Sequence, residues 1–296
     1  MTQLTTMKTH LFINIRWKCI LMLLILTLGG GGKAWGQWNG VTYFGTDQTI
    51  NMTGDVTMTG GMIIGYCTVT INANGADRTI TRGSSFSSGS LFTVVTNGKL
   101  VINGGGNTII IDGNNVNTSV YGSCIQCMSF EGTKVQLSNV TFKNHRASNY
   151  SGGAIALQSV VETSMTGCSF INNYSVDYGG AIYIDNSPST TITNCSFTNN
   201  SAGVQGGAIF NDYTSSSNNI TIKNTTITGN SAISEGGGIY NIAQLKVEGE
   251  VVIDGNTKGS GVTSNVYISD YSDSGRHYYI DINTAGLSWP YPHFFA

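Results

Sequence analysis

Two cysteines, Cys124 and Cys127, are separated by two residues in the segment Gly-Ser-Cys-Ile-Gln-Cys. Such a pair can bind a metal ion or cycle between a dithiol and a disulfide. A zinc site would require a second pair of ligands at a suitable spacing, and a thioredoxin-like site would require a helix after the first cysteine. The sequence contains neither, so we predict no metal site at this pair.

Two aspartates, Asp185 and Asp212, are the best candidates for catalysis. Each lies six residues after the first glycine of a recurring Gly-Gly-Ala-Ile segment, so on adjacent strands their side chains would lie about 5 Å apart. Two such carboxylates could share Ca²⁺ or act as acid and base on a polysaccharide. The equivalent positions in the neighbouring copies hold Gln158 and Ile242, and no Arg, Lys or His occupies a nearby repeat position. This pattern favours two solvated aspartates over a catalytic centre, and it predicts no cofactor unless an enzyme uses Ca²⁺ here.

Four aromatic residues recur at one position of the same repeat: Tyr183, Phe210, Tyr240 and Tyr267. Each follows a residue expected to face the core, and strand alternation therefore points this column outward. Exposed stacked rings can pack against sugar faces or form the apolar centre of a protein contact. The alternative is that the rings cover one another or are covered by loops. We predict a ligand-binding stripe and keep that alternative open.

The elements that position these residues are short strands in a repeat. Copies of Gly-Gly-Ala-Ile or a close variant begin at Gly152, Gly179, Gly206 and Gly236, at spacings of 27, 27 and 30 residues. A second motif runs in phase with them, and together they produce three apolar columns with strand-like alternation. The columns are Phe142, Phe170, Phe197, Ile227 and Ile253; Leu137, Met165, Ile192 and Ile222; and Ile155, Ile182, Ile209 and Ile239.

One coil of 27 to 30 residues cannot bury its apolar edge alone, but stacked coils bury a continuous core. We therefore predict an all-β fold, a single-stranded right-handed parallel β-helix, because crossovers between parallel strands are nearly always right-handed. About eight coils are expected between residues 40 and 285. The segment 37–88 would hold the N-terminal cap and first coils, 89–285 the repeats, and 286–296 a C-terminal tail. A β-propeller is less suitable, since its blades need about 40 to 50 residues.

Other repeated polar residues have structural explanations. The column Asn173, Asn200, Asn230 and Asn256 follows an inward apolar residue, where the chain must turn. Asparagine tolerates left-handed backbone, and its amide can bond a stacked neighbour, so we predict a ladder. His145 takes this position one coil earlier and is predicted to be a turn residue. Cys168 and Cys195 share one inward column and are expected to be buried thiols.

The N-terminal 36 residues are typical of an export signal, with Lys8, Arg16 and Lys18 ahead of a ten-residue apolar run from Cys19. That run is too short to span a bilayer, which takes about 20 residues, and we predict no transmembrane segment. Removal of residues 1–36 leaves 10 basic against 16 acidic residues, a net charge of −6. The few scattered basic residues argue against a nucleic-acid partner.

The pairing of Gly-Gly-Ala-Ile with Phe-x-x-Asn, as in Phe170 to Asn173 and Phe197 to Asn200, resembles a known repeat. It is similar to the polymorphic outer-membrane-protein repeat of bacterial surface proteins, which forms a right-handed parallel β-helix in adhesins. The resemblance covers residues 122–268. It implies an exported protein at the outer-membrane surface or outside the cell, and adhesion to a host or neighbouring cell.

We therefore expect a surface or secreted binder, with a cell-surface glycan or protein as its ligand. The alternative is a polysaccharide lyase or glycoside hydrolase on the same pectin-lyase-like scaffold, because one fold can support unrelated functions. An enzyme requires a convergent cluster of charged groups, whereas a binder requires only an exposed stripe. The sequence shows the stripe and no convincing cluster.

Overall fold

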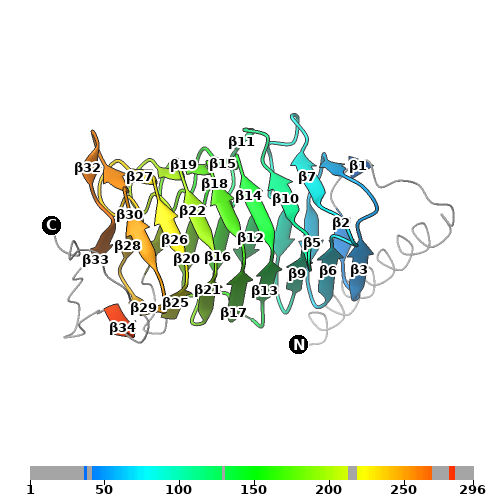
Figure 1. The fold of residues 1–296 in the computed structure, drawn as a ribbon. Helices are drawn as coiled ribbons and strands as arrows, with labels where there is room; N and C mark the ends of the chain where they lie inside the picture. The colour runs from blue at the N-terminus through cyan, green and yellow to red at the C-terminus, as the bar shows by residue number, and fades with distance from the viewer. Residues whose placement is uncertain (1–36, 39–41, 129–130, 213–218, 269–279, 284–296) are drawn as a thin grey trace, which may run out of the picture.

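The computed structural model describes residues 37–38, 42–128, 131–212, 219–268 and 280–283, and the predicted signal segment and C-terminal tail lie outside these ranges. Within them the secondary structure consists of strands and turns without a helix, and accordingly no described helix has the length and hydropathy that a membrane span needs. The strands stack from β3 at one end to β33 at the other, as Figure 1 shows. The chain is a parallel β-helix, as the repeat predicts.

Four parallel sheets run along the stack, and three of them contain nine strands each. Sheet A contains β1 (Gln37–Trp38), β4 (Val56–Met58), β7 (Arg78–Arg82), β10 (Ile109–Asp112), β14 (Val140–Lys143), β18 (Ser169–Ile171), β22 (Ser196–Thr198), β26 (Thr226–Thr228) and β30 (Val252–Asp254). Sheet B contains β2 (Thr42–Phe44), β5 (Met62–Ile64), β8 (Phe92–Val94), β12 (Ile125–Met128), β16 (Ile155–Gln158), β20 (Ile182–Asp185), β24 (Ile209–Asn211), β28 (Ile239–Asn241) and β33 (Val266–Ile268).

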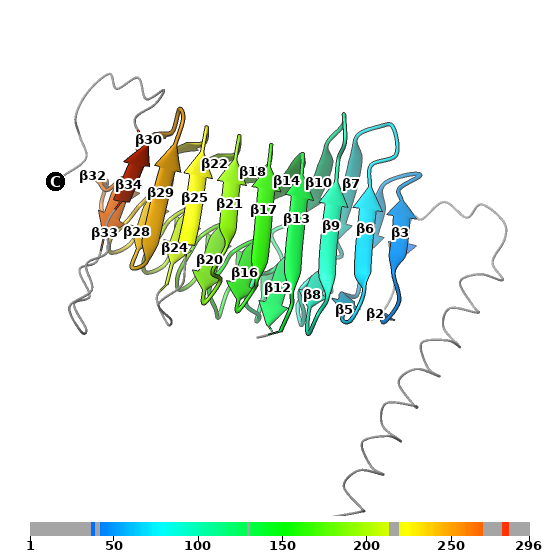
Figure 2. The same ribbon diagram turned by 90° about the horizontal axis from the view of Figure 1, so that it is seen from below.

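Sheet C faces the viewer in Figure 2 and contains β3 (Gln48–Asn51), β6 (Thr68–Asn72), β9 (Lys99–Asn103), β13 (Lys134–Ser138), β17 (Glu162–Thr166), β21 (Thr190–Thr193), β25 (Asn219–Lys223), β29 (Gln244–Glu248) and β34 (Ile280–Asn283). Sheet D is shorter and contains β11 (Asn117–Thr118), β15 (Arg146–Ala147), β19 (Tyr174–Ser175), β23 (Ser201–Ala202), β27 (Ser231–Ala232), β31 (Thr257–Lys258) and β32 (Val262–Thr263). Strand β32 pairs with β31 in the antiparallel direction.

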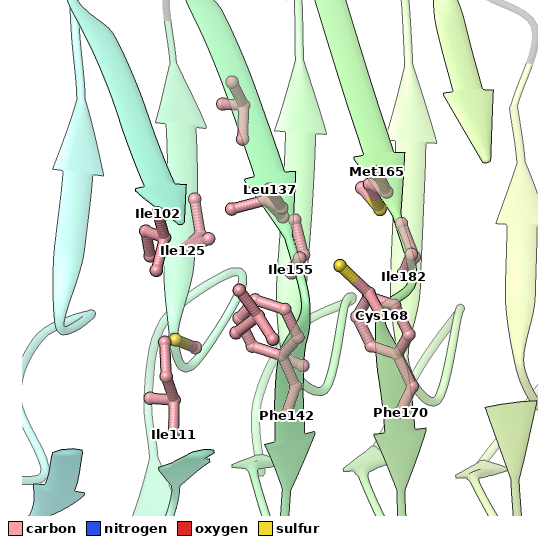
Figure 3. Packing of buried hydrophobic residues seen from close by; sticks show 14 of the residues in the cluster. Ile102, Ile111, Ile125, Leu137, Phe142, Ile155, Met165, Cys168, Phe170 and Ile182 are labelled. Atoms are coloured by element: carbon pink, nitrogen blue, oxygen red, sulfur yellow. The ribbon is translucent and has the colours of Figure 1, made fainter. Parts of the chain in front are cut away.

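The core is built from the predicted columns. Phe142, Phe170 and Phe197 are in register on sheet A and are fully buried. Their rings stack at centroid distances of 5.0 and 4.6 Å, the spacing that parallel strands impose. Figure 3 shows Phe142 and Phe170 side by side, with Leu137 and Met165 from sheet C packing above them. We call these three phenylalanines the inner stack.

Each glycine of the Gly-Gly pair is required for a different structural reason. The first one, as at Gly179, has a positive φ of 64°, which side chains with a Cβ rarely adopt. The second one, Gly180, lies so close to the next coil that a Cβ would collide with the carbonyl oxygen of Gly207. The motif therefore encodes a left-handed turn followed by a close approach of two backbones.

The predicted asparagine ladder is present and fully buried. The side-chain amide of Asn173 donates to the Oδ1 of Asn200 at 2.9 Å, and Asn200 donates in the same way to Asn230 at 2.9 Å. Asn230 continues the ladder to Asn256, again at 2.9 Å. One detail of the prediction is wrong: the left-handed residue is the one before each ladder asparagine, namely Asn172, Asn199, Gly229 and Gly255.

His145 occupies the ladder position of its coil, as predicted for a turn residue, and is completely buried. Its Nε2 lies 3.1 Å from the carbonyl oxygen of Ile111, so a proton on Nε2 reproduces the bond that Asn173 donates to Phe142. Burial and the nearby positive charge of Arg82 lower the pKa of His145 to about 3. The imidazole is therefore neutral at physiological pH.

Arg82 is a fully buried arginine that the repeat pattern does not reveal. Its guanidinium donates to the carbonyl oxygens of Phe86 at 2.7 Å and Gly89 at 2.9 Å, and also to that of Ser123. Desolvation lowers the pKa of Arg82 to about 10, which leaves it charged near neutral pH. In the coils before the asparagine ladder, Arg82 thus holds the irregular backbone together by satisfying its carbonyl groups.

Candidate binding face

The Cys124 and Cys127 pair belongs to the core. Cys127 is in register with Leu157 on β16, and both thiols are fully buried and free. Burial raises the pKa of each thiol well above its usual value, so neither is a ready nucleophile. Among the described residues, no three His, Cys, Asp or Glu side chains gather in an arrangement that could hold a metal ion. Cys124 precedes β12, so the alternation of side chains along that strand does not apply to it and does not place the two thiols on opposite faces.

Cys168 and Cys195 are buried free thiols on adjacent coils, as predicted. The backbone N–H of Cys168 donates to the Sγ of Cys195 at 3.4 Å. Cys195 in turn contacts the carbonyl oxygen of Thr193 at 3.2 Å. These sulfur atoms fill the core and satisfy backbone groups, which is a structural role.

Asp185 and Asp212 are neighbours, because they directly follow the paired residues Ile184 and Asn211. Both aspartates are partly buried at the end of their strands. Asp212 accepts a hydrogen bond of 2.8 Å from the hydroxyl of Tyr183. One of the two carboxylates is therefore engaged by the aromatic column itself.

The aromatic column lies on the outer side of sheet B, but most of it is not exposed, contrary to the expected stripe. The exposed fraction is only 8% for Tyr183, 4% for Phe210 and 7% for Tyr240, whereas it is 37% for Tyr267. Phe210 and Tyr240 stack with their centroids 5.0 Å apart, and Tyr240 stacks on Tyr267 at 4.9 Å. With Ala156, the three buried rings form a hydrophobic cluster outside the main core. We call Tyr183, Phe210, Tyr240 and Tyr267 the outer stack.

Tyrosines from the turns that enter sheet B cover the outer stack. Tyr178 lies over Phe210 with its ring centroid 4.6 Å away. Tyr121 lies 6.3 Å from Tyr183 and stacks on Tyr150 at 4.6 Å. Tyr150 is 40% exposed, and Tyr121 and Tyr178 are partly exposed. These three residues lie outside the repeated columns and present the aromatic surface to solvent. Tyr121 and Tyr178 each stand directly before a repeat glycine, which is the signal that marks them in the sequence.

The charge around these rings is acidic. Burial is the largest cause that raises the pKa of Tyr121, and the carboxylates of Asp177 and Asp185 raise it further. Burial likewise raises the pKa of Tyr183, and the negative charges of Asp212 and Asp185 raise it further. The strands of sheet B contain no lysine or arginine. We call Tyr121, Tyr150, Tyr178, Tyr183, Asp177, Asp185 and Asp212 the tyrosine-acid face.

Sheet C presents a different outer surface. Lys134 on β13 pairs with Glu162 on β17 at 2.7 Å, and Lys246 pairs with Glu248 on β29 at the same distance. Lys223 also approaches Glu248, at 3.8 Å. Opposite charges alternate along this sheet, which is typical of a solvated surface.

Three segments of the chain match the model of the Chlamydia polymorphic membrane protein repeat: residues 167–185, 194–212 and 224–242. No curated protein and no solved structure matches the chain. Each matched segment runs from a strand of sheet A, through the ladder asparagine and a strand of sheet D, to a strand of sheet B. One repeat therefore carries both an inner-column residue and an outer-stack ring, and the first two copies end on Asp185 and Asp212.

Proposed function

We propose that this protein is exported to the bacterial outer surface, where its β-helix acts as an adhesin through the tyrosine-acid face. The three repeat matches and the parallel β-helix support a surface β-helix protein. Adhesion is the further step that we propose.

The observation that carries the proposal is the partly exposed layer of tyrosines over the outer stack. Tyrosine and other aromatic side chains supply large contact areas at low conformational cost, and they are enriched where proteins bind one another. The layer rests on the buried rings of Tyr183 and Phe210, so its geometry is held from below. A rigid apolar platform with a polar rim has the character of a recognition surface.

A cell-binding assay tests the proposal. Beads coated with the purified protein are incubated with cultured epithelial cells, and the bound beads are counted. Replacing Tyr150→Ser together with Tyr178→Ser removes two solvent-facing rings and should reduce binding several-fold, since few residues carry most of the affinity of an interface.

The matched control replaces two exposed tyrosines of the N-terminal coils, Tyr43→Ser and Tyr66→Ser, which are 62% and 67% exposed. The control protein should bind as the wild type does. If wild-type beads do not adhere, or if both double variants adhere equally well, the proposed function is wrong.

A further inference from the structure

The chemistry of the ligand can be taken one step further, and this step rests on the proposed function. Three carboxylates surround the tyrosine layer, one from each of three places in the fold. Asp177 immediately precedes Tyr178, Asp185 ends β20, and Asp212 follows β24. Two adjacent coils of the β-helix thus bring negative charge to the same group of rings.

The arrangement of rings and acids is specific. Tyr183 donates its hydroxyl proton to Asp212 at 2.8 Å, which orients that carboxylate at the edge of the ring. The ring centroids of Tyr121 and Tyr183 lie 6.3 Å apart, and the turns that hold Tyr150 and Asp177 are adjacent, since the N–H of Gly152 donates to the carbonyl oxygen of Tyr178 at 2.8 Å. After burial, the carboxylates of Asp177 and Asp185 raise the pKa of Tyr121. A ligand group that reaches the Tyr121 ring therefore meets negative potential from the carboxylates as well as from the π-face.

The described strands of sheet B carry neither lysine nor arginine. Among the described residues, the salt bridges lie within sheet A or within sheet C, except for one that joins Lys258 of sheet D to Glu235. Basic residues are therefore placed on the other faces. The two kinds of face differ in charge although they belong to the same coils.

We infer that the tyrosine-acid face binds a cationic segment of a partner protein, with an arginine or lysine side chain seated against Tyr121 and Tyr150 and held by Asp177 and Asp185. A guanidinium or ammonium group over a tyrosine ring gains cation-π attraction, which grows when the site excludes water. Adjacent carboxylates add charge-assisted hydrogen bonds to the same group. The predicted mature charge of −6 attracts a basic partner over longer distances.

Charge complementarity favours this occupant over a neutral glycan. A sugar ring can stack on tyrosine and its hydroxyl groups can donate hydrogen bonds to the carboxylates, but a neutral glycan gains no attraction between opposite charges from them. An anionic sugar would be repelled by them.

Fluorescence anisotropy with a defined peptide tests the inference. The probe is a labelled peptide of arginine-glycine-serine repeats, and its neutral counterpart has citrulline in place of each arginine. Wild-type protein should bind the arginine peptide and lose about tenfold in affinity at high salt, as charge pairing requires. The citrulline peptide should bind at least about tenfold more weakly, since it keeps the shape and loses the charge.

Two double variants with the same change in net charge separate a site from a general charge effect. Asp177→Asn with Asp185→Asn should weaken binding of the arginine peptide about tenfold, because both carboxylates contact the cation. Glu162→Gln with Glu248→Gln changes sheet C instead and should leave the affinity within about twofold. Equal losses in the two variants, or equal binding of the two peptides, would overturn the inference.

The cell assay distinguishes this outcome from failure of the proposed function. If Tyr150→Ser with Tyr178→Ser abolishes cell binding while Asp177→Asn with Asp185→Asn leaves it intact, adhesion through the face stands. The cationic partner is then wrong, and a neutral ligand such as a glycan takes its place.

Discussion

The inner and outer aromatic stacks are built by the same repeat and have nearly the same geometry. In the inner stack, ring centroids lie 5.0 and 4.6 Å apart, and in the outer stack the closest neighbours lie 5.0 and 4.9 Å apart. The stacking distance follows from the spacing of parallel strands in both cases. The difference is in what covers the rings: the inner stack is enclosed by three sheets, whereas the outer one is covered by turn tyrosines and bordered by acids. One stack lies inside the coil, and the other lies beneath the face that we propose for recognition.

The largest contrast should come from truncating a phenylalanine in each stack of the same coil. Phe197→Ala removes a fully buried inner ring and should lower the free energy of unfolding by about 3–5 kcal/mol, since it leaves a cavity. Phe210→Ala should cost about 1.5–3 kcal/mol, because water and the covering tyrosines can fill the outer space. Urea denaturation followed by circular dichroism measures both. Equal losses would mean that the two stacks are equivalent parts of one core.

The asparagine ladder supports the inner stack and should be the next most sensitive feature. Asn200→Ala removes the acceptor for the backbone N–H and the side-chain amide of Asn173. Two buried donors then lose their partners, which should cost about 2–4 kcal/mol in urea denaturation. Asn199→Gly, one residue earlier, is the control. It should be nearly neutral, since the same left-handed position holds Gly229 in the next coil. Comparable losses for the two variants would refute the ladder's contribution.

His145 at the head of the ladder should make stability depend on pH. Its pKa of about 3 in the folded protein lies below the ordinary 6.5 expected after unfolding. Between these values only the unfolded state is protonated at this residue, so stability falls as the pH falls. Lowering the pH from 7 to 5 should remove about 2 kcal/mol, measured as a shift of the urea midpoint.

His145→Asn replaces the imidazole with the residue of the later coils and should flatten this dependence. The comparison of the wild type with the variant isolates this histidine from the other titrating groups. An unchanged pH dependence in the variant would show that the buried imidazole does not control it.

The smallest effect is expected at the border of the outer stack. Tyr183→Phe removes the hydroxyl that donates to Asp212 and should cost about 1 kcal/mol, because the ring and its packing remain. Thermal unfolding compared with the wild type measures the change. A loss as large as that of Phe197→Ala would place Tyr183 among the residues of the inner core.

Much of the fold follows from the sequence because the repeat makes each column visible several times. Phe142, Phe170 and Phe197 recur at the spacing of the coil, and any strand arrangement that buries one of them buries all three. The cysteine pair near residue 124 belongs to the same repeat, since Cys127 pairs in register with Leu157. Periodicity thus identified the core and the register.

The repeat pattern could not predict how much of the outer stack is exposed to solvent. Alternation correctly placed Tyr183 outside the core, but it says nothing about residues in the turns, and Tyr121, Tyr150 and Tyr178 come from turns. Arg82 was missed for a related reason, because it satisfies backbone carbonyls of irregular loops that have no repeated counterpart. Contacts made by non-repeating residues leave no periodic signal.

A site-specific photo-crosslinker gives the most direct test of the central claim, that the tyrosine-acid face recognises the partner. A benzophenone side chain is introduced at Gln158, beside Asp185 on sheet B, and in a second protein at Ser164, which faces outward on sheet C. After binding to cells and illumination, the protein labelled at Gln158 should form a crosslinked product and the protein labelled at Ser164 should not. Crosslinking from Ser164 alone, or to the same extent from both positions, would contradict the account.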